Sequence, residues 1–292
     1  MEINNEANGE LGSFEDFESR AETRGPRVLR PRNRHLRRGV YLLPTLFTVG
    51  NLLCGYYAIL ATLEGRIGDL DHAARAIGYA ILFDALDGRV ARLTGTNSEF
   101  GKQFDSLADI VSFGIAPAFL TYAWGVRDLP SLAMGQSLHI YQAGWLFCFI
   151  FVACCAWRLA RFNIQGMAPT GGGSRYFVGL PCPAAAGMVA AMVHASYGPV
   201  PGVVFAILSL ILVLALGILM SSTVRYYSFK DIRWQQRRAS GPVIVLGALA
   251  LGAVVFYSRL TLVLMGGLYV IHGPVLELIR IVRRHRHAAR PA

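Results

Sequence analysis

Long apolar runs separated by short polar segments dominate the chain from residue 42 onward. Runs long enough to cross a bilayer, at about 20 residues each, lie at 42–63, 73–94, 103–125, 141–163, 178–197, 201–221, 241–257 and 260–279. A segment in the hydrocarbon core must satisfy its backbone polar groups internally, which favours α-helices. We therefore predict an all-α, polytopic integral membrane protein with a six-helix core and about two extra C-terminal transmembrane helices.

Charge patterning divides the chain further. The predicted parts are a disordered polar tail (1–40), the six-helix catalytic membrane core (41–221), a basic cytoplasmic loop (222–240), two additional transmembrane helices (241–279) and a basic tail (280–292). Lys and Arg gather in the tails and in alternate loops, as the positive-inside rule describes for cytoplasmic segments. We therefore expect a multi-pass protein of the cell (inner) membrane, with both termini on the cytoplasmic side.

Composition supports the membrane assignment. The chain is 54% hydrophobic and only 16% charged, with a mean hydropathy of +0.43, which excludes an ordinary soluble domain. The net charge of +10 does not indicate nucleic acid as a partner, because the basic residues lie where membrane topology places them, beside lipid headgroups. The five cysteines fall within apolar runs without ligand spacing, so we assign them to helix packing.

Four carboxylates stand out against this apolar background. Asp84, Asp87, Asp105 and Asp109 lie within 26 positions of a chain that has only 11 acidic residues beyond its N-terminal tail. Each one costs about 2.5 to 3.5 kcal/mol at membrane depth. The spacings i,i+3 and i,i+4 give each pair a shared helix face, and the polar turn 94–101 joins the two helices as a hairpin. We expect the two pairs to face each other and to require a counter-charge.

Carboxylate oxygens without nearby Cys or His suit hard cations, Mg²⁺ or Mn²⁺. Four carboxylates could hold two ions, and two ions can clamp a phosphoryl group. Gly88, Ala91 and Gly101 leave space beside the cluster, and Arg92 can reach phosphate oxygens. Two other interpretations remain open, namely salt bridges with neighbouring arginines and a proton or cation pathway.

The order of these residues forms one motif: Asp84-x2-Asp87-Gly88-x2-Ala91-Arg92-x8-Gly101-x3-Asp105-x3-Asp109. At every fixed position it resembles the signature of the CDP-alcohol phosphotransferase family of membrane enzymes. That family has a six-helix core, which corresponds to the first six spans. The resemblance implies that the four aspartates hold a pair of divalent cations. It also implies that Asp109 is the catalytic base that deprotonates the attacking alcohol.

The same resemblance implies contacts to the nucleotide and CDP-diacylglycerol. The residues concerned are Gly88, Ala91, Arg92, Ser98, Gly101, Thr48 and Asn51. Thr48 and Asn51 lie three apart on one face of the first span, where a hydrogen bond between helices is an equal alternative.

Three further stretches resemble family members that transfer the phosphatidyl group of CDP-diacylglycerol to L-serine and release CMP. They read DSLADIVSFGIAPA from Asp105, RLARFN from Arg158 and GLPCPAAA from Gly179. Arg158 and Arg161 would then hold the serine carboxylate or a lipid phosphate, although both also suit topology anchors. The resemblance favours direct attack over a covalent intermediate.

Other functions stay open. Within this chemistry the acceptor could be glycerol 3-phosphate, an inositol phosphate or choline, although a phosphorylated acceptor needs a denser cationic pocket. From a different class, the chain could be a cation transporter or an inactive scaffold, but neither needs Gly88, Ala91, Arg92 and Gly101. The last two spans carry no recognisable chemistry, and glycines 247, 252, 266 and 267 suit helix packing or a homodimer interface.

Overall fold

The computed structural model describes residues 34–64, 68–95, 98–127, 134–167, 176–196, 202–227, 252 and 257–288. Its helices are α2 (Arg34–Glu64), α3 (Asp69–Thr94), α4 (Glu99–Asp109), α5 (Ala116–Gly125), α6 (Met134–Met167), α7 (Cys182–Ala195), α8 (Val203–Ser221) and α10 (Ser258–Ala288). A π-helix, η1 (Ile110–Ile115), joins α4 to α5, and strands β1 (Tyr176–Val178) and β2 (Arg225–Tyr227) pair antiparallel. The chain divides into two compact units, 1–41 and 42–292, and the helix bundle belongs to the second.

Five helical segments among the described residues are long and apolar enough to cross a membrane. They are Pro44–Glu64, Glu99–Gly125, His139–Ile164, Val203–Ser221 and Ser258–Arg280. The continuous segment Glu99–Gly125 comprises α4, η1 and α5, and α7 is a shorter apolar helix of 14 residues. The predicted helical, multi-pass membrane protein is confirmed.

Several predicted boundaries differ from the structure. Helix α2 begins at Arg34, so the tail predicted over 1–40 is too long by seven residues. The span predicted at 178–197 begins late, at Cys182, because Gly179 has φ +83° and Pro181 precedes the helix. The small β1–β2 sheet lies where no strand was predicted. The predicted span 241–257 falls outside the described residues except for Gly252 and Tyr257.

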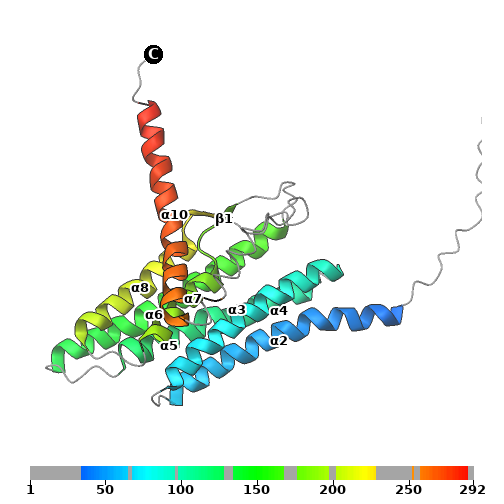
Figure 1. Ribbon diagram of the computed structural model, residues 1–292, viewed down its shortest axis with the longest axis horizontal. Helices are drawn as coiled ribbons and strands as arrows, with labels where there is room; N and C mark the ends of the chain where they lie inside the picture. The colour runs from blue at the N-terminus through cyan, green and yellow to red at the C-terminus, as the bar shows by residue number, and fades with distance from the viewer. Residues whose placement is uncertain are drawn as a thin grey trace, which may run out of the picture. The chain divides into compact units, whose positions relative to one another are not determined.

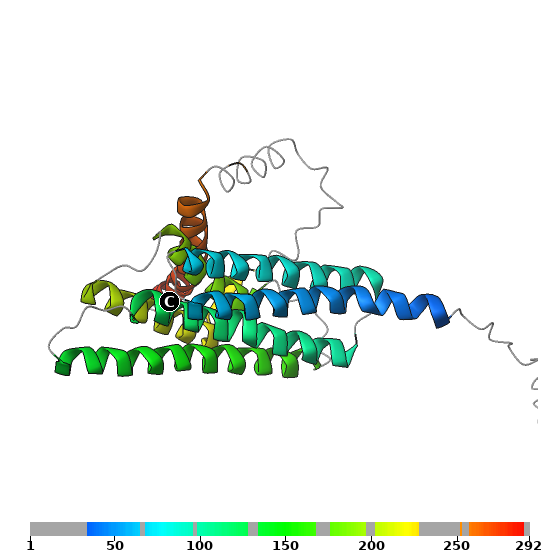
Figure 2. The ribbon, with the colours of Figure 1, turned by 90° about the horizontal axis from the view of Figure 1, so that it is seen from below.

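Helices α2, α3 and α4 run side by side (Figures 1 and 2). The α3–α4 hairpin turns at Gly95, whose φ of +63° lies in the left-handed region and whose N–H donates to Ala91 O. Helix α3 also packs against α7. A Cβ added to Gly187 of α7 would lie 3.1 Å from Ile81 Cδ1 of α3, so the missing side chain permits a close approach.

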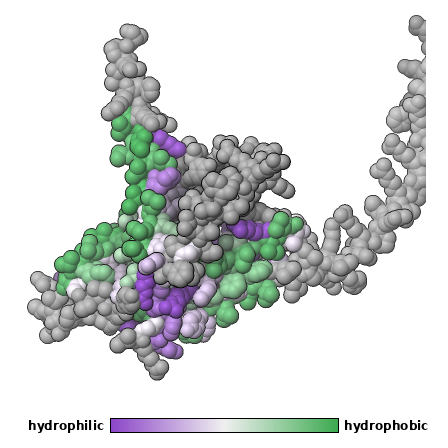
Figure 3. Space-filling view, in the orientation of Figure 1, coloured by the Kyte–Doolittle hydropathy of each residue, from purple (hydrophilic) through white to green (hydrophobic). Residues whose placement is uncertain are grey.

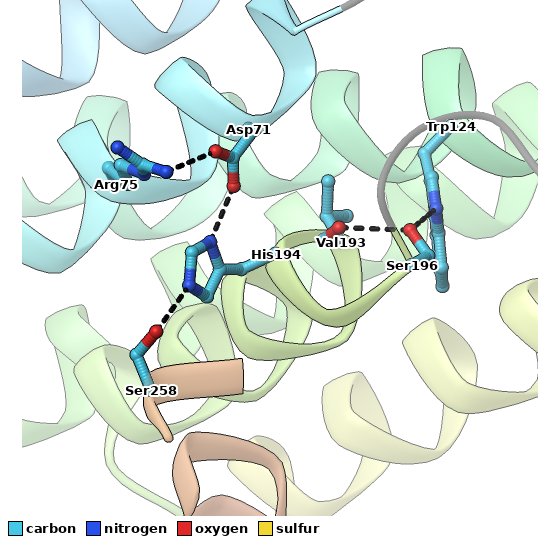
Figure 4. A network of polar contacts seen from close by, with 7 residues as sticks. All are labelled: Asp71, Arg75, Trp124, Val193, His194, Ser196 and Ser258. Atoms are coloured by element: carbon cyan, nitrogen blue, oxygen red, sulfur yellow. Dashed lines mark hydrogen bonds and ion pairs between the residues drawn. The ribbon is translucent and has the colours of Figure 1, made fainter. Parts of the chain in front are cut away.

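A polar network joins the first turns of α3 to α7 and α10 (Figure 4). His194, in the last turn of α7, pairs through Nδ1 with Asp71 Oδ1, and its Nε2 lies 3.0 Å from Ser258 Oγ at the start of α10. Asp71 Oδ2 also binds Arg75 Nη2 at 2.6 Å. These contacts fix the N-terminal end of α10 to the core.

Strand β2 contacts α10 further along the helix, through the side chain of Tyr226. A Cβ added to Gly273 would lie 2.4 Å from the Tyr226 ring, so only glycine leaves room for this ring. The Tyr226 hydroxyl donates to Val270 O at 3.2 Å. Elsewhere α10 exposes its apolar side chains, with Leu268 75% exposed, and hydrophobic residues line its visible side (Figure 3). Helix α10 thus meets the core along one side and presents an apolar surface elsewhere.

Candidate active site

The signature aspartates converge from two helices. Asp84 and Asp87 lie one turn apart on α3, and Asp105 and Asp109 lie one turn apart at the end of α4. Ligand oxygens of Asp84, Asp105 and Asp109 all lie within 4.8 Å of one another. Asp87 is also close, since its carboxyl contacts that of Asp105. The hairpin therefore brings together both predicted pairs.

Two of the clustered carboxylates are almost completely buried. Asp87 and Asp109 are only 5% and 7% exposed, and Asp105 Oδ1 is buried without a hydrogen-bond partner among the described residues. Like charges this close repel strongly in a low-dielectric setting. A cluster of acceptor oxygens with one oxygen left unpaired suits a hard divalent cation, which takes oxygen ligands. The residues present therefore fit a cation site.

Helix α2 supplies hydrogen bonds to two of the carboxylates. Thr48 Oγ1 donates to Asp87 Oδ2 at 3.2 Å, and Asn51 Nδ2 donates to Asp109 Oδ1 at 3.0 Å. Asn51 is fully buried. Of the two roles considered for these residues, the structure displays hydrogen bonds between helices, which orient the carboxylates. Contact with a nucleotide stays a prediction.

The π-helix η1 holds Asn51 in place. Ser112, in η1, donates from Oγ to the backbone carbonyl of Asn51 at 2.9 Å. The helices approach so closely that a Cβ added to Gly55 would lie 2.3 Å from Ser112 Oγ and 2.7 Å from Ser112 Cα. π-Helical turns are frequent at functional sites, and this one begins directly after Asp109. Gly55 and Ser112 thus fix the position of the Asn51–Asp109 pair.

The connecting turn has a clear structural role. Ser98 is the N-cap of α4, and its Oγ accepts the Gly101 N–H at 2.9 Å. A Cβ on Gly101 would lie 3.0 Å from this oxygen, so the glycine keeps the turn tight. Gly88 and Ala91 lie on α3 beside the aspartates, whereas the side chain of Arg92 falls outside the described residues. Their predicted nucleotide contacts stay predictions.

Arg158 of α6 is buried against Cys182, the first residue of α7. It is 8% exposed, and its Nη1 donates to Cys182 Sγ at 3.5 Å. Arg158 Nε is buried and has no acceptor in the part of the chain that the structure describes. Arg158 is therefore a buried and partly unsatisfied cation at the contact between α6 and the start of α7.

Arg161 has a different environment. Its guanidinium donates to the backbone carbonyls of Val178 at 3.0 Å and of Ser221 and Ser222 at 3.4 Å. A Cβ on Gly179 would lie 2.5 Å from Met220 O, so this glycine lets the chain pass against the end of α8. Arg161 thus satisfies carbonyls at the end of α8 and in β1, where a helix end leaves such groups without intrahelical partners.

Sequence reasoning missed Gly55 and Cys182 and gave Ser112 no role. No spacing rule marks these residues, because their importance comes from contacts between segments far apart in the chain. Ser98 is different, since Ser followed by Glu at the start of a helix is a recognisable N-cap pattern. The pairing of Asn163 Nδ2 with Ser106 Oγ at 3.0 Å, which ties α6 to α4, was likewise not predicted.

These features are those of a helical membrane protein with a buried carboxylate cluster that suits a divalent cation. The model of the CDP-alcohol phosphatidyltransferase family matches residues 41–224. The chain therefore belongs to this family, as its motif predicted. The matched range nearly coincides with the predicted core (41–221) and leaves α10 outside it.

Several curated proteins are similar to the chain. A CDP-diacylglycerol–serine O-phosphatidyltransferase of Helicobacter pylori (strain J99) is 33% identical over 247 residues, which cover 84% of this chain and 94% of that protein. A Methanocaldococcus jannaschii protein of the same name is 34% identical over 60% of this chain and 74% of its own length. An archaetidylserine synthase of Methanothermobacter thermautotrophicus is 35% identical over 63% of this chain and 69% of its own length.

Proposed function

We propose that this protein is a CDP-diacylglycerol–serine O-phosphatidyltransferase. The L-serine hydroxyl attacks the phosphorus bonded to the diacylglycerol oxygen, the bond to CMP breaks, and phosphatidylserine, CMP and a proton result. The observation that carries the proposal is the meeting of three signature carboxylates within 4.8 Å in a membrane helix bundle. The names of similar proteins that together cover most of the chain support serine as the acceptor.

The aspartates would hold the divalent cations. Asp84, Asp105 and Asp109 offer the closest oxygens, and Asp87 adds a fourth carboxylate beside Asp105. A bound cation, which we assign as Mg²⁺ or Mn²⁺ in a two-ion site, supplies charge neutralisation at the diphosphate and at the departing CMP.

Asp109 is the residue we assign as general base. Asn51 donates to its Oδ1, which fixes the orientation of the carboxylate. The second oxygen, Oδ2, is assigned to accept the proton of the serine hydroxyl, because a base must lie within hydrogen-bond reach of the proton it removes. The attack is direct, so the phosphatidyl group never bonds to the protein.

The CDP-diacylglycerol side of the site is assigned to the α3–α4 hairpin. Gly88, Ala91 and Gly101 would leave space for the diphosphate, and Arg92 would contact its oxygens. Ser98 and Thr48 complete this side in our proposal, and both hydroxyls also have structural partners. CDP-diacylglycerol would enter laterally, with its acyl chains against the bundle.

Arg158 is the better candidate for the serine carboxylate. Its buried Nε lacks a partner among the described residues, whereas the Arg161 guanidinium is engaged with backbone carbonyls. A guanidinium binds a carboxylate through parallel N–H donors. We therefore assign carboxylate recognition to Arg158 and support of the α8–β1 junction to Arg161.

The orientation of the protein in the membrane follows from the distribution of its charged residues. The N-terminal arginines and the basic C-terminal tail belong on the cytoplasmic side by the positive-inside rule. The site lies toward that end, because Asp84 and Asp87 occupy the second half of α3. We propose a cell (inner) membrane location with a cytoplasmic active site. A homodimer stays a prediction.

The test is CMP release by purified protein with CDP-diacylglycerol, Mn²⁺ or Mg²⁺ and one acceptor at a time. The acceptors are L-serine, glycerol 3-phosphate, an inositol phosphate and choline. Release that requires serine supports the proposal, and release with another acceptor would keep the chemistry and reject serine. No release with any acceptor, from protein that binds CDP-diacylglycerol, would favour an inactive scaffold.

A further inference from the structure

The guanidinium of Arg158 contacts a thiol to which the proposed mechanism gives no role. Arg158 Nη1 donates to Cys182 Sγ at 3.5 Å, and Cys182 Sγ donates to the backbone carbonyl of Cys155 at 3.9 Å. Cys155 lies about one turn before Arg158 on α6. Both cysteines are fully buried. The Cys182 thiol therefore joins the Arg158 side chain to the backbone of its own helix.

Backbone contacts fix the position of Cys182. It is the first residue of α7, directly after Pro181. The Leu180 N–H donates to Leu219 O, in the last turn of α8, at 3.0 Å, and the Leu180 side chain is fully buried. The start of α7 is thus attached to the end of α8, which leaves the thiol little freedom to move away from Arg158.

Two contacts of α6 show which part of the bundle lies beside Arg158. A Cβ added to Gly114 of η1 would lie 3.5 Å from Cys155 Sγ, three residues before Arg158. Asn163, five residues after Arg158, donates from Nδ2 to Ser106 Oγ of α4 at 3.0 Å. Helix α6 therefore runs antiparallel to α4 and η1. Arg158 lies between these two contacts, at the level of the segment that carries the base of the proposed mechanism.

The contact with Cys182 leaves one edge of the guanidinium available. Nη1 lies on one side of the planar group, whereas Nε and Nη2 form another edge. Arg158 is 8% exposed, and no described residue accepts a hydrogen bond from its buried Nε. A carboxylate binds such an edge through two parallel N–H donors. Arg158 held at Nη1 therefore presents the edge that a carboxylate fits.

We propose that Cys182 is a positioning residue that fixes the Arg158 guanidinium for the carboxylate of the acceptor. This inference rests on the proposed function, in which Arg158 binds that carboxylate. A long side chain with few fixed partners retains rotamer freedom, which it must lose when the acceptor binds. The thiol removes part of that freedom in advance. Its benefit therefore appears in acceptor binding and leaves the chemical step unchanged.

The experiment measures the steady-state kinetics of Cys182→Ala, Cys182→Ser and wild type with varied L-serine and with varied CDP-diacylglycerol. Cys182→Ala should raise the serine KM about fivefold, the scale of immobilising one long side chain, with kcat and the CDP-diacylglycerol KM unchanged. Cys182→Ser keeps a donor and acceptor at this place and should stay within about twofold of the wild-type serine KM. The matched control is Cys148→Ala, because Cys148 is buried on the same helix, about 15 Å along its axis from Arg158. This control should keep the wild-type serine KM.

A double-mutant cycle tests whether Cys182 acts through Arg158. Arg158→Ala should itself raise the serine KM, and adding Cys182→Ala should raise it no further. Multiplicative effects, or equal increases in the KM values of both substrates, would overturn the inference. A normal serine KM in Cys182→Ala, with a raised one in Arg158→Ala, would reject the role of Cys182 alone. A normal serine KM in Arg158→Ala would reject the assignment of Arg158 in the proposed function and this inference with it. If Cys182→Ala does not fold, Cys182→Val, which fills the site without a thiol, takes its place with the same expected outcomes.

Discussion

Replacement of Gly55 by alanine is expected to damage the active site through packing alone. The added Cβ would lie 2.3 Å from Ser112 Oγ and 2.7 Å from Ser112 Cα, whereas ordinary van der Waals contact begins near 3.4 Å. Shortening Ser112 would not relieve the clash, because its own Cα is in the way. Helix α2 or η1 must therefore shift.

The magnitude follows from the size of that overlap. Overpacking a tight contact costs about 1 to 3 kcal/mol, which corresponds to a fall in Tm of roughly 2 to 10 °C for a chain of this size. The shift also moves Asn51, which donates to Asp109, and a displacement of about 1 Å at a catalytic group can cost about 100-fold in rate. We expect Gly55→Ala to lose at least about tenfold in kcat.

The assay pairs a thermal melt in detergent with serine-dependent CMP release. The matched control is Gly78→Ala, because an added Cβ at Gly78 meets nothing within 4 Å among the described atoms. Alanine in a helix is favoured over glycine by about 1 kcal/mol, so this control should keep its activity and have a Tm no lower than that of the wild type. Wild-type activity and Tm in Gly55→Ala would refute the account of the α2–η1 contact.

Further predictions concern charge and hydrogen bonding at and near the site. Asn51→Ala removes a hydrogen bond to a buried carboxylate, a contact of about 1.5 to 3 kcal/mol, and should lower kcat/KM at least about tenfold. The control Thr62→Ala, at a residue that is also buried on α2, should not lower kcat/KM. Equal effects of the two substitutions would contradict the role of Asn51. Chelation of divalent cations should abolish CMP release and added Mn²⁺ or Mg²⁺ should restore it; full activity after exhaustive chelation would reject a metal site. Arg161→Ala should lower the Tm and spare the serine KM, since its guanidinium binds backbone carbonyls; the reverse result would move carboxylate recognition to Arg161. Burial raises the pKa of Tyr226 from 10.0 to about 12, so its contribution to stability is complete below pH 10 and is lost as the pH rises toward 12. Melting curves of Tyr226→Phe should therefore lack the loss of Tm between pH 10 and 12 that this group causes in the wild type. The same dependence of Tm on pH in both proteins would contradict this role of Tyr226.

The sequence was sufficient for the parts of this site that depend on helical periodicity. The i,i+3 and i,i+4 spacings and the polar turn correctly predicted that carboxylates of α3 and α4 would meet. The prediction was correct because both aspartate pairs lie close to one hairpin turn, so that local helix geometry determines where the carboxylates lie. The long apolar runs likewise predicted the five membrane-spanning segments of the described residues. The runs at 73–94 and 178–197 form helices α3 and α7, which are not among those five.

Contacts between distant segments were not accessible in the same way. The π-helical turn and the Gly55–Ser112 contact depend on how α2 lies against η1, which no local pattern records. Arg158 and Arg161 looked equivalent in the sequence, at i,i+3 on one helix. Only the fold shows that Arg161 faces the end of α8 while Arg158 faces Cys182.

The central claim is that this protein joins serine to a phosphatidyl group with Asp109 as the base. The most direct measurement follows radiolabelled L-serine into chloroform-soluble lipid while CMP is quantified in the same reaction, for wild type and Asp109→Asn. The account predicts one labelled phosphatidylserine per CMP in wild type, and neither product from Asp109→Asn protein that still binds CDP-diacylglycerol. CMP release without labelled lipid, or equal lipid labelling by Asp109→Asn, would contradict it.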